Sequence, residues 1–377
     1  MRDMLAHADL ARYARQFVWL ELNYDEPKNR VFLTKYNASA TPTFFIIDPQ
    51  DGKVAAAQTG AMSLAELTEF LDRGASGVFS RRQTPADVAL KKGDALLARQ
   101  PANAANAYAE ALRLAPGDWS RREVAQASLA GALQDSSQWQ ECAETAVNEA
   151  AHMNRDVFFA RTVVAGMWCL ASADPAPWSN VALGKLEPLA QEALSLSITV
   201  RDHRDAIYRT FMYISVARGD KTAAGKWGDR WLDELDAIKP QDDEERSALD
   251  IARVENIQIY GDPTRILPAL TESERVMVHN YIASLRLAQM DSAAKHYDDA
   301  IAACDRGLAR APASNGRAWL LQIKARALQQ EGRVKEAQHA LEQALQAAQE
   351  IPDKSSREMN LKMIKMALEQ SASGSQM

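Results

Sequence analysis

Cysteine and histidine, the residue types that most often carry chemistry, are few in this sequence and far apart. The three cysteines form no C-x-x-C motif, which excludes a zinc ribbon and a disulfide-stapled scaffold. Each cysteine lies on the apolar face of a predicted helix, so we expect buried, unreactive thiols at Cys142, Cys169 and Cys304. The six histidines show no metal-binding spacing, so no metal site is predicted; they are His7, His152, His203, His279, His296 and His339.

The remaining cofactor and ligand classes also lack their signatures. No glycine-rich phosphate loop is present, so no nucleotide cofactor is expected. The 377 residues carry a net charge of −6, which argues against general nucleic-acid binding. No apolar run approaches the roughly 20 residues of a membrane span, and no signal peptide is visible. We therefore expect a cytoplasmic protein as given, with a periplasmic or exported location as the alternative if a leader has been lost.

The first 75 residues differ from the rest because they contain strand-like segments. An apolar and aromatic run, Phe17-Val18-Trp19-Leu20-Glu21-Leu22, suits a strand buried on both faces. A second run, Thr43–Ile47, is followed by an Asp-Gly turn and a returning strand. The predicted order is helix 3–15, strand 17–22, helix 26–36, strand 43–47, strand 54–58 and helix 63–73.

Beyond this module the strand signal disappears. Glycine, serine and two arginines over residues 76–84 indicate a linker. From residue 85 to the end at 377, amphipathic helices alternate with short breaks, which favours helices that pack antiparallel with their neighbours.

Small and large apolar residues recur at fixed offsets within the helical region. Ala104, Tyr108, Ala111 and Pro116 have the same spacing as Ala300, Cys304, Gly307 and Pro312. A further copy combines Ala325, Leu328 and Gly332 with Ala337, Leu341 and Ala344, and the last two copies are offset by 37 residues. This pattern resembles the tetratricopeptide repeat family at both ends of the region, while residues 120–275 lose it. The resemblance implies protein binding on a concave helical surface, and in the last clear repeat we expect Gln322, Arg326 and Gln329 to contact a bound peptide.

Landmarks of another family occur in order in the first module. They are the segment Asn23-Tyr24-Asp25-Glu26-Pro27, the turn Thr41-Pro42-Thr43, and Asp48, Gly52 and Gly60 around the hairpin. Together they resemble the second two-thirds of a thioredoxin-fold domain. The resemblance implies that Pro42 is cis and that the backbone of Thr41 pairs with an extended peptide.

The departure from that family concerns its active site. The family places a C-x-x-C motif at the start of its first helix, after a first strand, and this chain opens inside that helix with Met1-Arg2-Asp3-Met4. Both active-site cysteines and the first strand are therefore absent, and no thiol–disulfide catalysis is expected as given. Three explanations are open: the start is internal to a longer protein, the two orphaned strands pair directly, or another chain completes the sheet.

The predicted fold class is α+β followed by all-α: an incomplete thioredoxin-like α/β module (1–75), a linker (76–84) and a tetratricopeptide-like α-solenoid of antiparallel helix pairs (85–377). We expect a protein with no catalytic residues and no cofactor that binds a protein or an extended peptide. One alternative is a thiol–disulfide oxidoreductase of the thioredoxin superfamily that acts in cell redox homeostasis and whose C-x-x-C-bearing N-terminus is missing from the sequence as given. The other is a structural subunit of an envelope assembly. Partner identity, redox direction and oligomeric state stay open.

Overall fold

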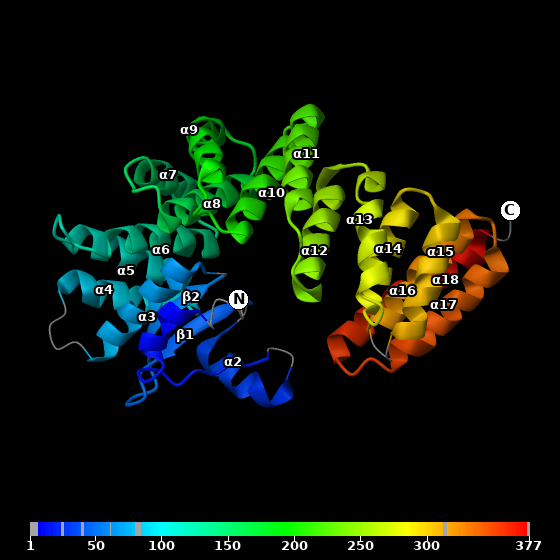
Figure 1. Cartoon of the computed structure of the whole chain (residues 1–377), viewed down its shortest axis with the longest axis horizontal. Coiled ribbons are helices and arrows are strands. Elements are labelled where there is room, and N and C mark those ends of the chain that lie inside the picture. Colours follow the sequence, from blue (N-terminus) through cyan, green and yellow to red (C-terminus); the bar gives the residue numbers. More distant parts are fainter. Residues whose placement is uncertain are drawn as a thin grey trace. The chain divides into compact units, whose positions relative to one another are not determined.

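A computed structural model describes residues 7–23, 26–38, 41–60, 62–79, 84–311 and 315–374. The protein is mostly helical and divides into two compact units, residues 1–220 and 221–377 (Figure 1). The predicted boundary between a first module and a helical domain at 76–84 stays a prediction.

The first unit combines a small hairpin module with helix pairs. Its elements are η1 (Ala8–Tyr13), η2 (Pro27–Asn29), α2 (Arg30–Tyr36), β1 (Thr43–Ile47), β2 (Val54–Thr59), α3 (Leu64–Phe79), α4 (Pro85–Leu97), α5 (Pro101–Leu114), α6 (Arg122–Asp135), α7 (Trp139–Ala150), α8 (Val157–Ser172), α9 (Pro177–Ser195) and α10 (Arg201–Ala217).

The described residues of the second unit form helices joined by turns, without a strand. Its elements are α11 (Lys221–Ala237), α12 (Asp243–Tyr260), η3 (Pro263–Arg265), α13 (Leu267–Val276), α14 (Tyr281–Ala293), α15 (Tyr297–Arg310), α16 (Asn315–Gln330), α17 (Val334–Gln349) and α18 (Lys354–Gly374).

The hairpin forms where the sequence predicts it. β1 pairs antiparallel with β2, with Phe45 opposite Ala57, and the connecting turn places Gly52 at a φ of 67°. The Thr41–Pro42 peptide bond is cis, as the family resemblance implies. Helix α3 crosses the hairpin closely at Gly74, where a methyl group would overlap the side chain of Ile46. Gly74 therefore permits close packing instead of ending the helix, and α3 continues to Phe79 beyond the predicted end near residue 73.

The predicted strand over residues 17–22 is wrong. Phe17 packs against the hairpin core, but the following segment forms no strand, and the side chains of Val18 and Leu20 are 89% and 75% exposed. The physical reason is that a strand needs a neighbour for its backbone, and the described sheet contains only β1 and β2. The predicted helix over 3–15 is reduced to η1, and residues 3–6 of that prediction lie outside the described residues.

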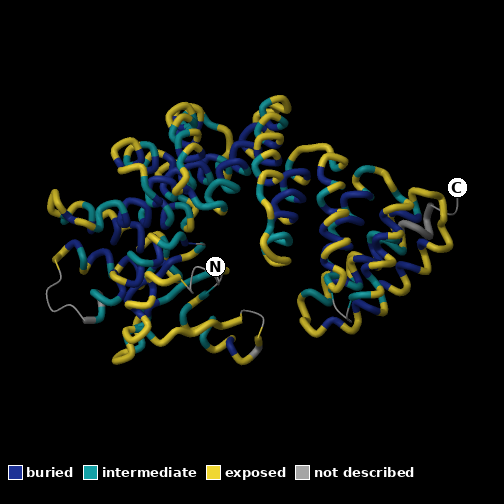
Figure 2. Tube along the Cα trace, in the orientation of Figure 1, coloured by how far each residue is buried: buried dark blue, intermediate teal, exposed yellow. Residues whose placement is uncertain are grey.

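Helix pairs with similar turns recur in both units. Adjacent helices pack in pairs such as α4 with α5, α14 with α15, and α16 with α17. Figure 2 shows the buried residues along these helices where the partners face each other. Three of the turns place one residue in the left-handed region, at φ values of 58° for Ser137, 64° for Lys295 and 72° for Gly332. This arrangement ends a helix by satisfying its last carbonyl groups, so the chain can reverse within a few residues.

The expectation of three free thiols is wrong for two of the cysteines. Cys142 in α7 and Cys169 in α8 form a disulfide bond, with their Cα atoms 6.2 Å apart. The two helices approach closely because small residues face each other, and a methyl group on Gly166 would overlap Ala146. Because the two helices lie so close, Cys142 and Cys169 on their facing sides come within bonding distance. Cys304 in α15 is buried and free, as expected.

Among the described residues, no helix has the length and apolar character needed to cross a bilayer.

The disulfide bond generates a prediction about stability. It closes a segment of 27 residues, for which the loss of chain entropy in the unfolded state amounts to about 3 to 4 kcal/mol. Reduction should therefore lower the free energy of unfolding by roughly that amount, measured by urea denaturation with and without dithiothreitol. Cys304→Ala should leave this difference unchanged. Thiol titration of the unfolded chain should find one reactive group without reductant and three after reduction; three groups without reductant would refute the disulfide.

Candidate functional site

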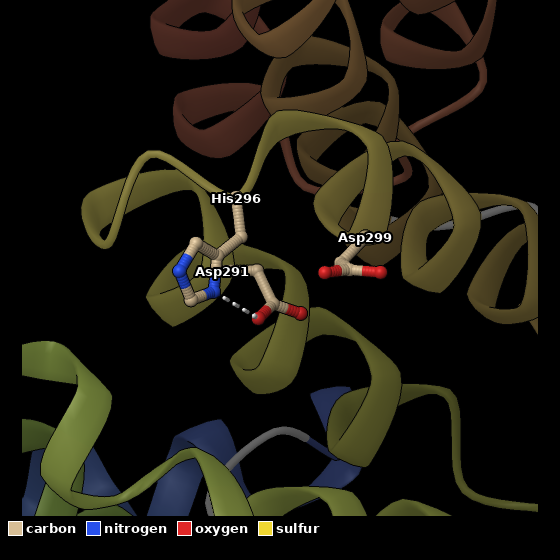
Figure 3. A group of neighbouring side chains, drawn as sticks. All are labelled: Asp291, His296 and Asp299. Carbon is tan, nitrogen blue, oxygen red and sulfur yellow. Dashed lines mark ion pairs between the residues drawn. The ribbon is translucent and has the colours of Figure 1, made fainter.

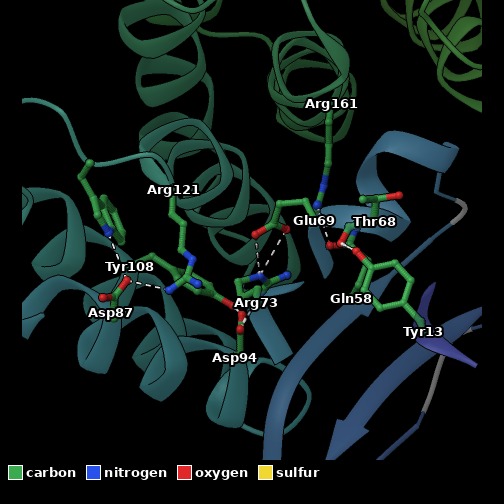
Figure 4. A network of polar contacts seen from close by, with 11 residues as sticks. Tyr13, Gln58, Thr68, Glu69, Arg73, Asp87, Asp94, Tyr108, Arg121 and Arg161 are labelled. Atoms are coloured by element: carbon green, nitrogen blue, oxygen red, sulfur yellow. Dashed lines mark hydrogen bonds and ion pairs between the residues drawn. The ribbon is translucent and has the colours of Figure 1, made fainter. Parts of the chain in front are cut away.

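A buried ion pair links the hairpin module to the first helix pair (Figure 4). Arg73 of α3 donates from its Nη1 to Asp94 of α4, and both side chains are at most 5% exposed. Glu69, one turn before Arg73, approaches the Arg73 Nε to 3.3 Å. Tyr108 of α5 donates its hydroxyl proton to the second oxygen of Asp94 at 2.8 Å. We call these four residues the polar junction.

Burial and the neighbouring charges act in opposite directions on the polar junction: burial raises the pKa of Asp94, while the Arg73 charge and the Tyr108 hydrogen bond lower it. Burial lowers the pKa of Arg73, but the carboxylates of Asp94 and Glu69 outweigh this effect and hold it above its ordinary value. Burial, followed by the charge of Asp94, raises the pKa of Tyr108 well above its ordinary value. Arg73 therefore stays charged and Tyr108 stays protonated, so both continue to donate to Asp94.

The sequence near Asp94 explains how the tyrosine reaches it. Gly93 has no side chain, and a methyl group there would overlap the ring of Tyr108. Tyr108 is one of the residues of the tetratricopeptide-like pattern and is fully buried. The pattern could identify Tyr108, but nothing local to α3 or α4 signals that Arg73 and Asp94 meet.

Two further polar contacts hold the hairpin module in the first unit. Arg161 of α8 donates to the side-chain oxygen of Gln58 in β2 at 2.6 Å. Tyr13 of η1 donates its hydroxyl proton to Asp72 of α3 at 2.6 Å. The hairpin, α3 and helices α4, α5 and α8 are thus joined by hydrogen bonds as well as by apolar packing.

A cleft opens beside the polar junction. Its volume is about 680 Å³, and Arg121 at its rim pairs with Asp87 at 2.8 Å. The cleft lining holds a serine, Ser120, but none of its residues is a histidine or cysteine. The charged side chains Glu69, Arg73 and Arg121 are engaged with each other or with Asp94 and Asp87, which fits a structural role. The cleft is lined by Asp9, Leu64, Ala65, Thr68, Glu69, Asp72, Arg73, Ser120 and Arg121.

The predicted peptide-binding residues belong to both units. Thr41 is exposed and Pro42 half-buried at the start of the hairpin in the first unit. In the second unit, Arg326 is exposed and Gln329 half-buried on α16. Their roles in binding stay predictions. The expectation that Gln322 is exposed is wrong, because α18 covers this part of α16 and the Gln322 amide donates to the Asn360 side chain at 3.3 Å.

A large aromatic side chain lies on the surface of α16. Trp319 is 44% exposed and precedes Arg326 by seven residues, which places both on the same side of the helix. Ile323 lies between them and is half-buried. We call these three residues the α16 face. The spacing of seven was available from the sequence and could have connected Trp319 with Arg326.

None of the three cysteines offers a reactive thiol in the described structure. Cys142 and Cys169 are held in the disulfide, and burial raises the pKa of Cys304 to about 12. At neutral pH such a thiol carries almost no thiolate, the form that attacks disulfides.

Comparisons with known proteins give limited likenesses. No family model matches the chain, and no curated protein is significantly similar to it. Solved structures that resemble it include a tetratricopeptide repeat protein from Parabacteroides merdae, with 11% identity, a TM-score of 0.40, and coverage of 74% of this chain and 98% of that one. Another is the complex of the TPR2AB domain of yeast Sti1 with pHSP90, with 15% identity, a TM-score of 0.30, and coverage of 76% and 98%. At TM-scores below 0.5, neither likeness supports a statement about this chain.

The polar junction generates a prediction about stability. Asp94→Ala leaves the Arg73 guanidinium buried without its main partner, which should lower the free energy of unfolding by about 3 to 5 kcal/mol. Replacing both Arg73 and Asp94 with leucine should cost less than the single change, because the guanidinium is then no longer buried without its main partner. Urea denaturation measures both variants.

The matched control is Glu110→Ala, which removes the partner of the exposed Arg113 on α5. It should shift the urea midpoint little, because exposed ion pairs contribute little to stability. If Asp94→Ala unfolds at the wild-type midpoint, the polar junction does not stabilise the first unit.

Proposed function

We propose that this chain is a tetratricopeptide-like protein that binds other proteins through its helix pairs. The α16 face is the observation that carries the proposal. Tryptophan and arginine are the residue types most enriched among residues that dominate binding energy at protein interfaces. Here both are accessible on one side of one helix, with an apolar side chain between them.

The chemistry of the α16 face selects the class of partner. The Trp319 ring offers a large flat apolar surface, and the Arg326 guanidinium can pair with a carboxylate through two hydrogen bonds. The two Cα positions lie about 10 Å apart along the helix, from a rise of about 1.5 Å per residue. We infer a partner segment that carries an apolar side chain and an acidic side chain at a comparable separation.

A finer proposal concerns the first module, which we take to be a thioredoxin-like module that binds an extended segment. The element order from α2 through the hairpin to α3 agrees with that family, and the accessible side chains of Val18 and Leu20 support a binding surface. Contiguous exposed apolar side chains commonly mark interaction sites. The edge of β1 opposite β2 has no neighbouring strand among the described residues, so an extended segment could add to the sheet there, beginning at the Thr41 backbone.

The alternative activities find less support. A thiol–disulfide oxidoreductase needs an accessible thiolate, and the described cysteines provide none. No observation favours a structural envelope subunit over a binding protein. The disulfide does bear on location, because such bonds persist in oxidising compartments and are rare in the cytosol. We therefore propose a periplasmic or otherwise exported location in place of the cytoplasmic one expected from the sequence.

The α16 face generates a prediction about peptide binding. Peptides selected from a random display library on the full chain should be enriched in segments that combine apolar and acidic residues. Trp319→Ala and Arg326→Glu should each weaken the selected peptide at least about tenfold, the order expected for a dominant interface residue. Fluorescence anisotropy measures the affinity.

Arg275→Glu serves as the control, since Arg275 is an exposed arginine of the same unit outside the α16 face. It should leave the affinity within about twofold, because charges away from a contact change binding little. Selected peptides whose affinity is unaffected by both α16 variants would contradict the assignment of this face.

The first module generates a separate prediction. Replacing Val18 and Leu20 with glutamate should leave thermal stability unchanged, because both side chains are already exposed. It should weaken binding of a permanently unfolded probe, reduced and carboxymethylated lactalbumin, at least about tenfold by loss of apolar contact. Val181→Glu on α9 is the control, since Val181 is another exposed apolar residue of the same unit, at 63%. Equal binding by all three proteins would rule out residues 17–22 as the surface.

A further inference from the structure

The turn between α14 and α15 brings together two carboxylates and an imidazole (Figure 3). Asp291 lies in the last turn of α14, His296 precedes the first residue of α15, and Asp299 lies in the first turn of α15. One possible ligand atom from each residue lies within 4.8 Å of the other two. The Asp291 carboxylate is placed between the His296 ring and the Asp299 carboxylate in Figure 3.

The Asp291 carboxylate is buried without a hydrogen bond. Its side chain is 8% exposed, and no N–H or O–H group of the described residues donates to it. The His296 Nδ1 lies 3.9 Å from the Asp291 carboxylate, which is too long for a hydrogen bond. Arg306 contributes positive charge from further away, but its Nε is bonded to Glu274 at 2.8 Å. Burial, followed by the charge of Asp299, raises the pKa of Asp291 to about 6.

Similar turns elsewhere in the chain show that the fold does not need a carboxylate here. In five turns the residue that follows a left-handed position donates its N–H to a carbonyl five residues earlier. The accepting residues are Leu33, Leu133, Ser215, Asp291 and Leu328. The position occupied by Asp291 is therefore an uncharged residue in each of the other four turns, a leucine in three of them and a serine in the fourth. A buried carboxylate without a donor costs free energy, so its presence calls for a partner that the chain itself does not supply.

We propose that Asp291, His296 and Asp299 bind a divalent transition-metal ion, with Zn²⁺ as the best fit. Zinc accepts one imidazole with carboxylate ligands, whereas Mg²⁺ and Ca²⁺ prefer oxygen ligands alone. The ion would neutralise the facing carboxylates and hold the end of α14 against the start of α15. His296 and Asp299 are exposed, which leaves a path for entry and room for water as a further ligand. The sequence prediction of no metal rested on histidine spacing and did not consider an Asp-x4-His-x2-Asp arrangement across a turn.

Zinc titration of the full chain tests the site. After treatment with a chelator and dialysis, isothermal calorimetry should detect one saturable Zn²⁺ site, and saturation should raise the midpoint of thermal unfolding. His296→Ala and Asp299→Asn should each weaken this binding at least about tenfold, since even indirect support of a metal ligand commonly contributes that much. His339→Ala is the control, because His339 also faces a carboxylate, that of Glu342 at 4.0 Å, but both side chains are exposed.

A second variant addresses the buried carboxylate itself. Asp291→Leu introduces the residue that three of the other four turns carry at this position. It should abolish zinc binding while raising the thermal midpoint of the metal-free chain. If this variant does not fold, zinc binding by His296→Ala and Asp299→Asn tests the site, because both substitutions change exposed side chains. The proposal is overturned if the wild-type chain shows no saturable site, if these two variants bind as the wild type does, or if Mg²⁺ binds as tightly as Zn²⁺.

Discussion

The Arg73–Asp94 ion pair is the interaction on which the arrangement of the first unit depends. A single buried guanidinium without a carboxylate, or the reverse, is strongly unfavourable, so the pair requires α3 and α4 to stay in contact. Tyr108 extends this requirement to α5 through its hydrogen bond to Asp94. The small hairpin, which could not be stable alone with two strands, thereby becomes part of a larger helical core. The same contacts engage Glu69 and Arg73, two charged residues that line the adjacent cleft.

The elements that could be predicted from the sequence are those specified by nearby residues. The strand at Thr43–Ile47 and its return follow from an apolar run and an Asp-Gly turn, and the start of α12 follows from four consecutive acids, with Asp242 accepting from the Glu245 N–H. The apolar run at residues 17–22 failed as a strand because strand formation depends on a neighbour elsewhere in the chain. Composition can identify a segment that is able to form a strand, but it does not show whether another strand is available to pair with it.

The candidate sites were predicted less completely, because they depend on residues far apart in sequence. Arg326 and Tyr108 could be identified from the repeat pattern. Arg73 and Asp94 are 21 residues apart on different helices, and Cys142 and Cys169 are 27 apart, with no motif that joins either pair. Gln322 was expected on the surface, but α18 supplies Asn360 from 38 residues further along and covers it. Each of these outcomes was decided by which helices become neighbours.

The contact between Arg161 and Gln58 spans 103 residues of chain, and this separation has a consequence for biosynthesis. A ribosome that adds roughly 5 to 20 residues per second needs on the order of 5 to 20 s to make α8 after the hairpin has been made. During that interval the hairpin can already pack on α3 and α4, the helices that contact β2, but Gln58 lacks its partner Arg161. The order of synthesis therefore lets the hairpin dock on its own helices first and adds the polar contact to α8 last.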